Sequence, residues 1–173
     1  MKSRNLLPFV FIAVFACFTN QSHAQISAGA NVGFFKLLED GSDAQFGFNL
    51  TGKYALTENI KVGANLGYYV KSYEFWGTTM KSSVMPFVAL AEYGFSFDKI
   101  RPYVGADAGI YRFAVHASGE TDGNSYFGFA PVVGCNYELT SKIWLNANMK
   151  FHVIMSDDST TAFGLLIGAI YNL

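Results

Sequence analysis

The stretch IWLNANMKFHVIM, at positions 143–155, alternates strictly between apolar and polar residues. Successive side chains of a β-strand point to opposite faces, so this stretch predicts a strand with one apolar and one polar face. The apolar face carries Leu145, Ala147, Met149, Phe151 and Val153, and the opposite face carries Trp144, Asn146, Asn148, Lys150 and His152. Seven further stretches alternate, less cleanly at 84–95, and lie at about 25–36, 44–54, 60–72, 84–95, 101–115, 126–139 and 162–173. Pro86 cannot donate to a strand ladder, so we expect it at the start of its strand or in a bulge.

Four of these stretches end in a repeated motif. An aromatic residue, a spacer and an apolar residue recur at Tyr54-Ala55-Leu56, Tyr93-Gly94-Phe95, Tyr137-Glu138-Leu139 and Tyr171-Asn172-Leu173. Because residues i and i+2 share a face of a strand, the motif places a tyrosine at the same end of every second strand. Tyrosine is favoured at a membrane–water interface, where its ring meets lipid and its hydroxyl meets water. The four tyrosines therefore predict a periplasmic aromatic girdle.

The N-terminus has the features of an export signal. Lys2 and Arg4 precede an apolar run from Leu6 to Phe18, and Ser22-His23-Ala24 offers a small-x-small cleavage site. We therefore expect residues 1–24 to be a signal peptide and residues 25–173 to form one domain. A lipoprotein signal cut before Cys17 is an alternative, against which the bulky Phe15 argues. Removing Lys2 and Arg4 from the 12 Lys and Arg leaves 10 against 13 Asp and Glu, a net charge of −3.

Composition and face chemistry predict a transmembrane β-barrel. The chain is 51% hydrophobic, yet past the signal no segment is long and apolar enough for a membrane helix. In lipid every backbone polar group must be paired, which leaves a closed barrel. A soluble ligand-binding barrel of the lipocalin kind is the alternative, but its core would have to consist of the Gly-, Asn- and Lys-rich face. We predict an all-β, eight-stranded, antiparallel up-and-down barrel in the outer membrane of a Gram-negative-type bacterium.

The connections and the inner face complete the expected barrel. Short turns at 57–59, 96–100 and 140–142 predict the periplasmic end, and longer loops at 37–43, 73–81, 116–125 and 156–161 predict the extracellular end. Eight strands leave an interior just wide enough for side chains, so we expect a plug of ion pairs rather than a hydrated pathway. The inward ionisable residues of this lumen network are Lys53, Lys61, Lys71, Glu92, Asp107, Glu138, Lys150 and His152.

Three stretches resemble the eight-stranded outer-membrane barrel family, which is OmpA/OmpX-like in architecture and includes the opacity-type surface proteins. They are Arg101-Pro102-Tyr103-Val104-Gly105-Ala106-Asp107-Ala108-Gly109, Phe127-Gly128-Phe129-Ala130-Pro131, and the C-terminal Gly168-Ala169-Ile170-Tyr171-Asn172-Leu173. The resemblance implies that Gly168, Tyr171 and Leu173 belong to a signal read by the barrel assembly machinery. It further implies contact with outer-membrane lipid and lipopolysaccharide.

Function is less constrained by the sequence. We expect a non-enzymatic structural or surface-interaction protein that meets an extracellular ligand through its loops; the ligand itself is not specified by the sequence. A narrow pore is the runner-up, and a lipid-modifying enzyme with His116 or His152 as base and Ser118, Ser125 or Ser156 as nucleophile is a third class. No cofactor or metal is expected, since no spacing matches a calcium loop. The loop carboxylates could still bridge to lipopolysaccharide phosphates through divalent cations: Glu39, Asp40, Asp43, Glu120, Asp122, Asp157 and Asp158. The mildly acidic balance gives nucleic acid no basic surface.

Overall fold

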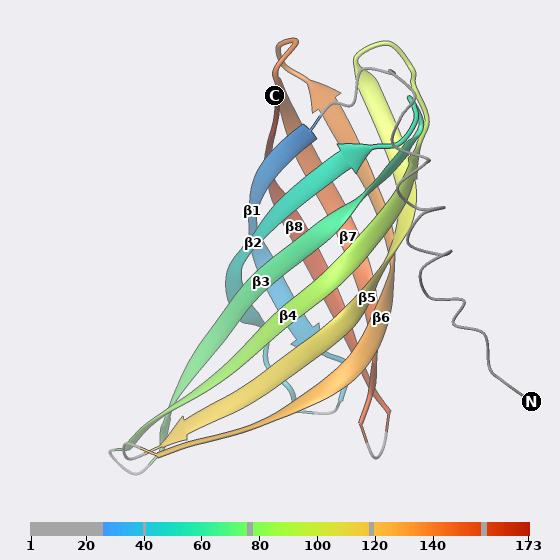
Figure 1. Cartoon of the computed structure of the whole chain (residues 1–173). Coiled ribbons are helices and arrows are strands. Elements are labelled where there is room, and N and C mark those ends of the chain that lie inside the picture. Colours follow the sequence, from blue (N-terminus) through green and yellow to red (C-terminus); the bar gives the residue numbers. More distant parts are fainter. Residues whose placement is uncertain (1–25, 40, 76–77, 118–119, 157–158) are drawn as a thin grey trace, which may run out of the picture.

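The computed structural model describes residues 26–39, 41–75, 78–117, 120–156 and 159–173. The described residues form eight strands that close into one barrel, with neighbours antiparallel and in chain order (Figure 1). The strands are β1 Ile26–Leu37, β2 Gln45–Ala55, β3 Ile60–Phe75, β4 Thr78–Gly94, β5 Ile100–Ala117, β6 Glu120–Glu138, β7 Ile143–Met155 and β8 Thr160–Asn172. No helix in this part of the chain is long and apolar enough to cross a membrane. The expected signal at 1–24 lies outside the described residues.

The first and last strands close the barrel. β1 pairs with β8 from Ser27↔Asn172 to Leu37↔Ala162, and the amide of Leu173 donates to the carbonyl of Ile26 at 2.9 Å. Gly168 lies at this seam, where a Cβ atom would approach the Cα of Asn31 and the carbonyl oxygen of Ala30 too closely. A residue without a side chain is therefore required at position 168 for the two strands to approach.

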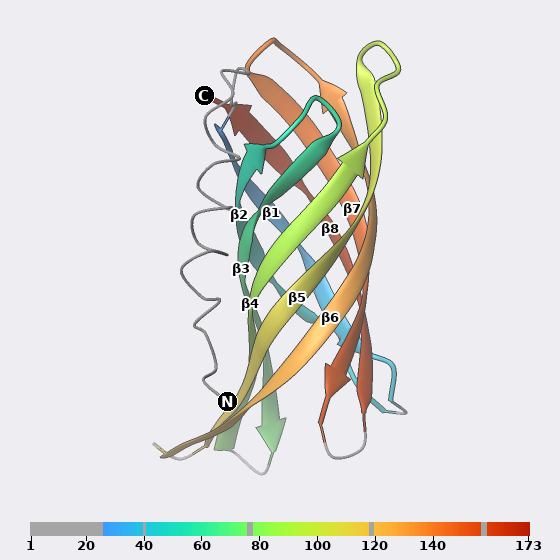
Figure 2. The ribbon, with the colours of Figure 1, turned by 45° about the vertical axis from the view of Figure 1, so that its right-hand side comes forward.

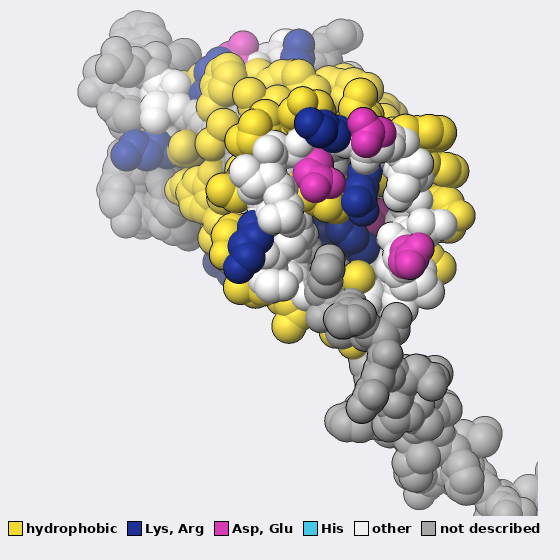
Figure 3. Space-filling view, turned by 90° about the horizontal axis from the view of Figure 1, so that it is seen from above, with side chains coloured by type: hydrophobic (Ala, Val, Ile, Leu, Met, Phe, Trp, Pro, Cys, Tyr) yellow, Lys and Arg dark blue, Asp and Glu magenta, His cyan; other side chains and the backbone are white. Residues whose placement is uncertain are grey.

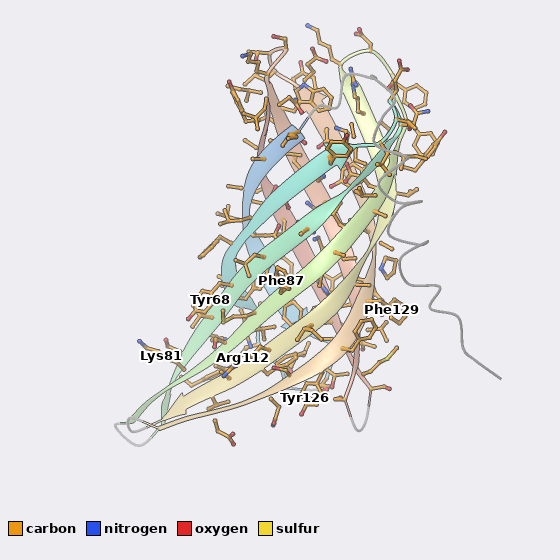
Figure 4. All side chains as sticks on the ribbon, in the orientation of Figure 1. Tyr68, Lys81, Phe87, Arg112, Tyr126 and Phe129 are labelled. Atoms are coloured by element: carbon orange, nitrogen blue, oxygen red, sulfur yellow. The ribbon has the colours of Figure 1, made fainter. Side chains whose placement is uncertain are left out.

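The barrel carries its apolar side chains on the outside. Phe46, Phe87 and Ile167 are 68%, 63% and 59% exposed, although each is large and apolar. Figure 4 shows Phe87 and Phe129 on the outer wall. Such a continuous apolar surface is stable only against lipid, because water would disfavour it. The predicted eight-stranded antiparallel transmembrane barrel is confirmed.

The predicted extent of two of the longer loops is wrong, because the strands on either side of them are longer than expected. Most of residues 73–81 and 116–125 continue the hairpins β3–β4 and β5–β6, which pair out to Phe75↔Thr78 and Ala117↔Glu120. Figures 1 and 2 show these four strands running past the rest of the barrel at the end away from the short turns. Beyond the membrane both faces of a sheet meet water, so the apolar–polar alternation stops while backbone pairing continues. Alternation therefore marks the lipid-spanning part of each strand and not its end.

Pro86 also departs from the expectation. It lies in the interior of β4, and pairing with β3 is interrupted between Leu66↔Phe87 and Tyr69↔Val84. The register is the same on both sides of the interruption, so no residue is added and there is no bulge. Gly67 faces this point, and a Cβ atom there would lie 2.8 Å from Cγ of Pro86. The missing side chain of Gly67 makes room for the proline ring inside the strand.

The stability of the barrel should depend strongly on the polarity of the side chains on its lipid-facing wall. Leu66, 44% exposed near the middle of β3, meets hydrocarbon, whereas Leu139 lies just beyond β6 at a short turn. We expect L66R to lower the free energy of unfolding by about 2–4 kcal/mol and L139R by about 0–1 kcal/mol. Denaturant unfolding of the barrel in lipid vesicles measures both values. Equal losses for the two variants would contradict the placement of the wall in lipid.

Candidate functional site: the barrel interior and its two ends

Two ion pairs occupy the middle of the barrel interior. Lys53 Nζ of β2 lies 2.6 Å from Glu92 Oε2 of β4, and Lys150 Nζ of β7 lies 2.6 Å from Asp107 Oδ2 of β5. All four side chains are at most 8% exposed. Two cations and two carboxylates make this layer neutral. Each pair joins two strands that have one strand between them, so each pair spans part of the lumen.

Amide and hydroxyl groups extend these ion pairs into a network. Asn65 Nδ2 donates to the same Asp107 oxygen at 3.0 Å, and the Thr51 hydroxyl bonds to Asn65 Oδ1. On the other wall Asn148 Nδ2 donates to Asn146 Oδ1 at 2.7 Å, and Asn146 Nδ2 donates to the hydroxyl of Tyr103 at 3.0 Å. Buried polar groups are costly unless they are paired, and these partners satisfy several of them within the wall.

An apolar layer lies between this network and the extracellular end. It consists of Phe35, Tyr69, Val84, Val88, Tyr111, Ile154, Ala162 and Leu166, each at most 4% exposed. His152 sits in this layer with its Nδ1 2.8 Å from the hydroxyl of Tyr111 and its ring centroid 5.0 Å from that of Phe35. Tyr111 itself packs over Gly128, whose Cβ would lie 2.9 Å from the Tyr111 ring. The missing side chain of Gly128 on β6 thus makes room for the aromatic ring of Tyr111 from the neighbouring strand β5.

The cavity in the middle of the described barrel is small. The cavity beside the ion pairs, lined by residues such as Asn31, Asn148 and Lys150, has a volume of about 20 Å³. That is room for about one water molecule. On the extracellular side of the apolar layer, Leu37, Phe113, Tyr126 and Ile154 line an open cup of about 230 Å³. The apolar layer therefore separates the cup from the polar network.

The end of the barrel with the short turns, which we expect to face the periplasm, is a basic and aromatic mouth. Trp144 of β7 has the Arg101 guanidinium carbon 4.4 Å and the Lys61 Nζ 4.9 Å from its ring centroid. Glu138 Oε2 lies 3.6 Å from Arg101 Nη2. Figure 3, seen from this end, shows basic and acidic side chains at the centre and a surrounding ring of hydrophobic side chains.

The structure divides the expected lumen residues into three places. Lys53, Glu92, Asp107 and Lys150 form the central ion pairs, and His152 lies in the apolar layer. Lys61 and Glu138 lie at the periplasmic mouth. Lys71 lies at the extracellular rim, 2.7 Å from Asp43 Oδ2. The eight residues are therefore not one network.

Sequence reasoning missed the partners of these residues. Thr51, Asn65, Asn146 and Tyr103 complete the polar network, and Arg101 stacks on Trp144. Phe35 and Ile154 close the apolar layer. Their parity within the alternating stretches places all of them inward, but parity does not reveal which strands bring their residues together across the lumen.

The four motif tyrosines lie on the outer wall at the short-turn ends of their strands. Tyr93, Tyr137 and Tyr171 are 43%, 44% and 43% exposed, and Tyr54 is half-buried. Asn59 Nδ2 donates to the Tyr93 hydroxyl at 3.3 Å, which anchors that hydroxyl at the turn between β2 and β3. The tyrosine rings thus lie at the short-turn edge of the apolar outer wall.

The candidate catalytic residues that the structure describes, His152, Ser156 and Ser125, are not assembled. His152 is hydrogen-bonded to a tyrosine and is only 5% exposed, while Ser156 Oγ lies 3.2 Å from Thr160 Oγ1. Ser125 is exposed on β6, opposite Arg112. The side chain of His116 and the whole of Ser118 lie outside what the structure describes, as do Asp40, Asp157 and Asp158 and the side chain of Glu120. Within the described residues, no group of three or more His, Cys, Asp or Glu residues could hold a metal ion.

A closed barrel with an apolar outer wall and an ion-paired interior is an integral membrane barrel. The chain belongs to the outer membrane protein β-barrel domain family, whose profile matches residues 6–170, and it is an outer-membrane protein of a Gram-negative-type bacterium. Comparison with curated protein sequences finds no significant match.

Solved structures share the fold at low sequence identity. Neisserial surface protein A (NspA) aligns with a TM-score of 0.70 and 20% identity over 87% of this chain and 97% of its own. Ail, the attachment invasion locus protein of Yersinia pestis, in complex with the heparin analogue sucrose octasulfate, aligns with a TM-score of 0.67 and 15% identity over 88% of this chain and 100% of its own. The outer membrane protein OprG from Pseudomonas aeruginosa gives 0.55 and 15%, over 87% and 95%.

The central ion pairs should contribute much more to the stability of the barrel than the exposed ion pair at the rim. D107N leaves Lys150 buried without its counter-charge, so we expect the free energy of unfolding to fall by about 3–5 kcal/mol. D43N breaks the rim pair, in which the side chains of Lys71 and Asp43 are 30% and 55% exposed. We expect it to lower the free energy of unfolding by about 0–1 kcal/mol. Denaturant unfolding in the same detergent compares the two. Unchanged stability of D107N together with raised ion conductance would show that the network is not a plug.

The apolar layer predicts an electrically silent barrel. We expect the wild-type protein to show no discrete conductance steps in a planar lipid bilayer, because ions would have to pass a dry layer of fully buried side chains. F35A combined with Y111A removes two rings that are 1% and 0% exposed and should introduce small steps. F87A, which trims the lipid-facing wall, is the matched control. Regular conductance steps of the wild-type protein would favour the pore instead.

Proposed function

We propose that this protein is a non-enzymatic surface-interaction protein, and that the sheet formed by β3–β6 beyond the barrel is its interaction surface. The observation that carries the proposal is the length of these strands. β4 and β5 still pair at Lys81↔His116, and β5 and β6 still pair at Ala117↔Glu120. A four-stranded sheet thus continues past the neighbouring strands at the end opposite the short turns, which we expect to be extracellular, and this supports the proposal.

The edges of this sheet are open. β2 last pairs with β3 at Phe46↔Val70, and β7 last pairs with β6 at Phe127↔Met155. Within the described residues, 71–75 of β3 and 120–126 of β6 therefore have no strand partner on their outer side. Unpaired strand edges offer backbone donors and acceptors to an extended segment of another protein. Lys71, held by Asp43, partly protects the β3 edge, so the β6 edge is the better surface.

Charge favours a protein partner over a polyanion. Glu39, Asp43 and Asp122 are exposed at the extracellular end. Ail, whose structure contains a heparin analogue, shares the fold but only 15% of the sequence. Asp122 on the open β6 edge would repel a sulfated ligand there, whereas an extended protein segment could pair with this edge.

Outer-leaflet lipid is the second expected partner. Lys36, Lys81 and Arg112 are exposed at the extracellular end, with the outward parity of their strands, and Figure 4 shows Lys81 and Arg112 near that end. Cations at this level would meet the phosphates of lipopolysaccharide, for which Arg and Lys are suited. Gly168, Tyr171 and Leu173 remain our proposed signal for the barrel assembly machinery.

An enzyme and a pore are less well supported. The buried His152 has a tyrosine partner, and the space beside the ion pairs holds about one water molecule. Neither feature offers a reaction centre or a path for solutes.

Trimming the sheet tests the proposal. Asn-Gly turns in place of residues 72–81 and 112–125 remove the projecting strands and should abolish the adhesion of bacteria that display the chain to cultured epithelial cells. The matched control carries E39Q and D43N, which alter the rim charge and leave the sheet in place, and it should adhere like the wild type. Heat-dependent gel mobility confirms that both variants fold. Equal adhesion of the trimmed and wild-type chains would overturn the proposal.

A further inference from the structure

The periplasmic mouth gathers more hydrogen-bond donors and cations than its acceptors satisfy. The Arg101 guanidinium and the Lys61 ammonium approach the same indole, that of Trp144, at 4.4 Å and 4.9 Å from the ring centroid. A cation is attracted to an aromatic face, but two cations at one ring repel each other. Trp144 is only 7% exposed, so the ring is a fixed wall of the mouth.

Four donor groups lack a full complement of acceptors. The buried Nε1 of Trp144 and the buried Nε of Arg101 have no hydrogen-bond partner within the described part of the chain. The closest carboxylate to Arg101, that of Glu138, lies 3.6 Å from Nη2, which is longer than a hydrogen bond. Among the described residues Lys61 has no carboxylate within ion-pair distance. Buried donors in folded proteins ordinarily have an acceptor, so this cluster is unusual.

We propose that the periplasmic mouth binds an oxyanion, the carboxylate or phosphate group of a periplasmic solute or of an inner-leaflet lipid. An oxyanion supplies only acceptors and negative charge, which is what the indole N–H, the guanidinium edge and the ammonium lack. The Arg101 guanidinium carbon lies 4.4 Å from the indole centroid, and a guanidinium can bind two oxygens in parallel through its planar N–H edge.

The size of the hollow limits what enters it. Lys61, Arg101, Asn136 and Trp144 line a space of about 20 Å³, and the carboxylates of Glu58 and Glu92, the latter already paired with Lys53, also lie along it. A space of this size holds about one oxygen atom of the ligand's charged group, and the remainder of the ligand would lie in the periplasm or among lipid headgroups. Glu138 is the competitor from the chain itself, since its carboxylate is the nearest anion to Arg101. The site lies at the opposite end from the projecting sheet and is independent of that surface.

The fluorescence of Trp144 can report binding at the mouth without an added label. The chain has 2 tryptophans, so W76F leaves Trp144 as the sole emitter. The W76F barrel in uncharged detergent is titrated with inorganic phosphate, and chloride holds the ionic strength constant. We expect a saturable change in Trp144 emission. Binding should weaken about tenfold or more in R101Q and in K61Q, because each removes a charged donor. K142Q, which alters a lysine of a short turn outside the hollow, is the matched control.

A variant with the opposite expectation separates binding from damage to the fold. E138Q removes the competing carboxylate and should tighten phosphate binding several-fold, which a destabilised barrel would not do. Heat-dependent gel mobility verifies folding of every variant. An unsaturable response, or equal responses of wild type, R101Q and K61Q, overturns the proposal.

Vesicles distinguish the two sources of the oxyanion. The W76F barrel is compared in phosphatidylcholine and in phosphatidylcholine mixed with phosphatidylglycerol. A shift of emission caused by the anionic lipid and lost in R101Q assigns the site to a headgroup. A response to inorganic phosphate alone, also lost in R101Q, assigns it to a soluble oxyanion. No response in either arm, or one that R101Q retains, contradicts oxyanion binding.

Discussion

The need to pair every backbone polar group within hydrocarbon governs the rest of this structure. A sheet in lipid has no water to satisfy an open edge, so β1 must meet β8, and the seam from Ser27↔Asn172 to Leu37↔Ala162 closes the barrel. Closure at eight strands then makes the lumen too narrow for bulk water. It also requires close approach of the strands, which explains the missing side chain at Gly168. Where the hairpins leave the membrane the requirement ends, and β3 and β6 extend with open edges into water.

Because the closed barrel has a narrow interior, the charges inside it must be paired. Unpaired charge in a narrow lumen is strongly unfavourable, and the 2.6 Å contacts of Lys53 with Glu92 and Lys150 with Asp107 leave the central layer neutral. The apolar layer around Tyr111 and Phe35 shields these pairs from the extracellular side. At the periplasmic mouth the matching is incomplete, because Arg101 and Lys61 share one indole and, among the described residues, Glu138 is the one carboxylate within 4 Å of either cation. The mouth is therefore the interior region best suited to an external anion.

Alternation predicted the fold because lipid imposes it on each strand in turn. The strict pattern at 143–155 matches β7, Ile143–Met155, to the residue. The pattern failed at 73–81 and 116–125, where both faces of the sheet are in water and no alternation is needed. It also placed Pro86 wrongly, because the accommodation depends on Gly67 of the neighbouring strand. The alternating pattern indicated that Lys150 and Asp107 point into the barrel. Their contact within the lumen, however, depends on barrel closure and strand tilt, which the pattern does not give. For the same reason Arg101 on Trp144 could not be predicted from either strand alone.

Quenching by brominated lipid tests most directly the claim that the apolar face meets lipid and the polar face is enclosed. In W76F the remaining Trp144 is 7% exposed in the lumen, whereas F129W in a W76F, W144F background places a tryptophan at a position of the outer wall that is 40% exposed. Both proteins are reconstituted in vesicles whose acyl chains carry bromine. The account predicts strong quenching of the F129W emission and little quenching of Trp144. Stronger quenching of Trp144 than of the F129W emission would contradict it.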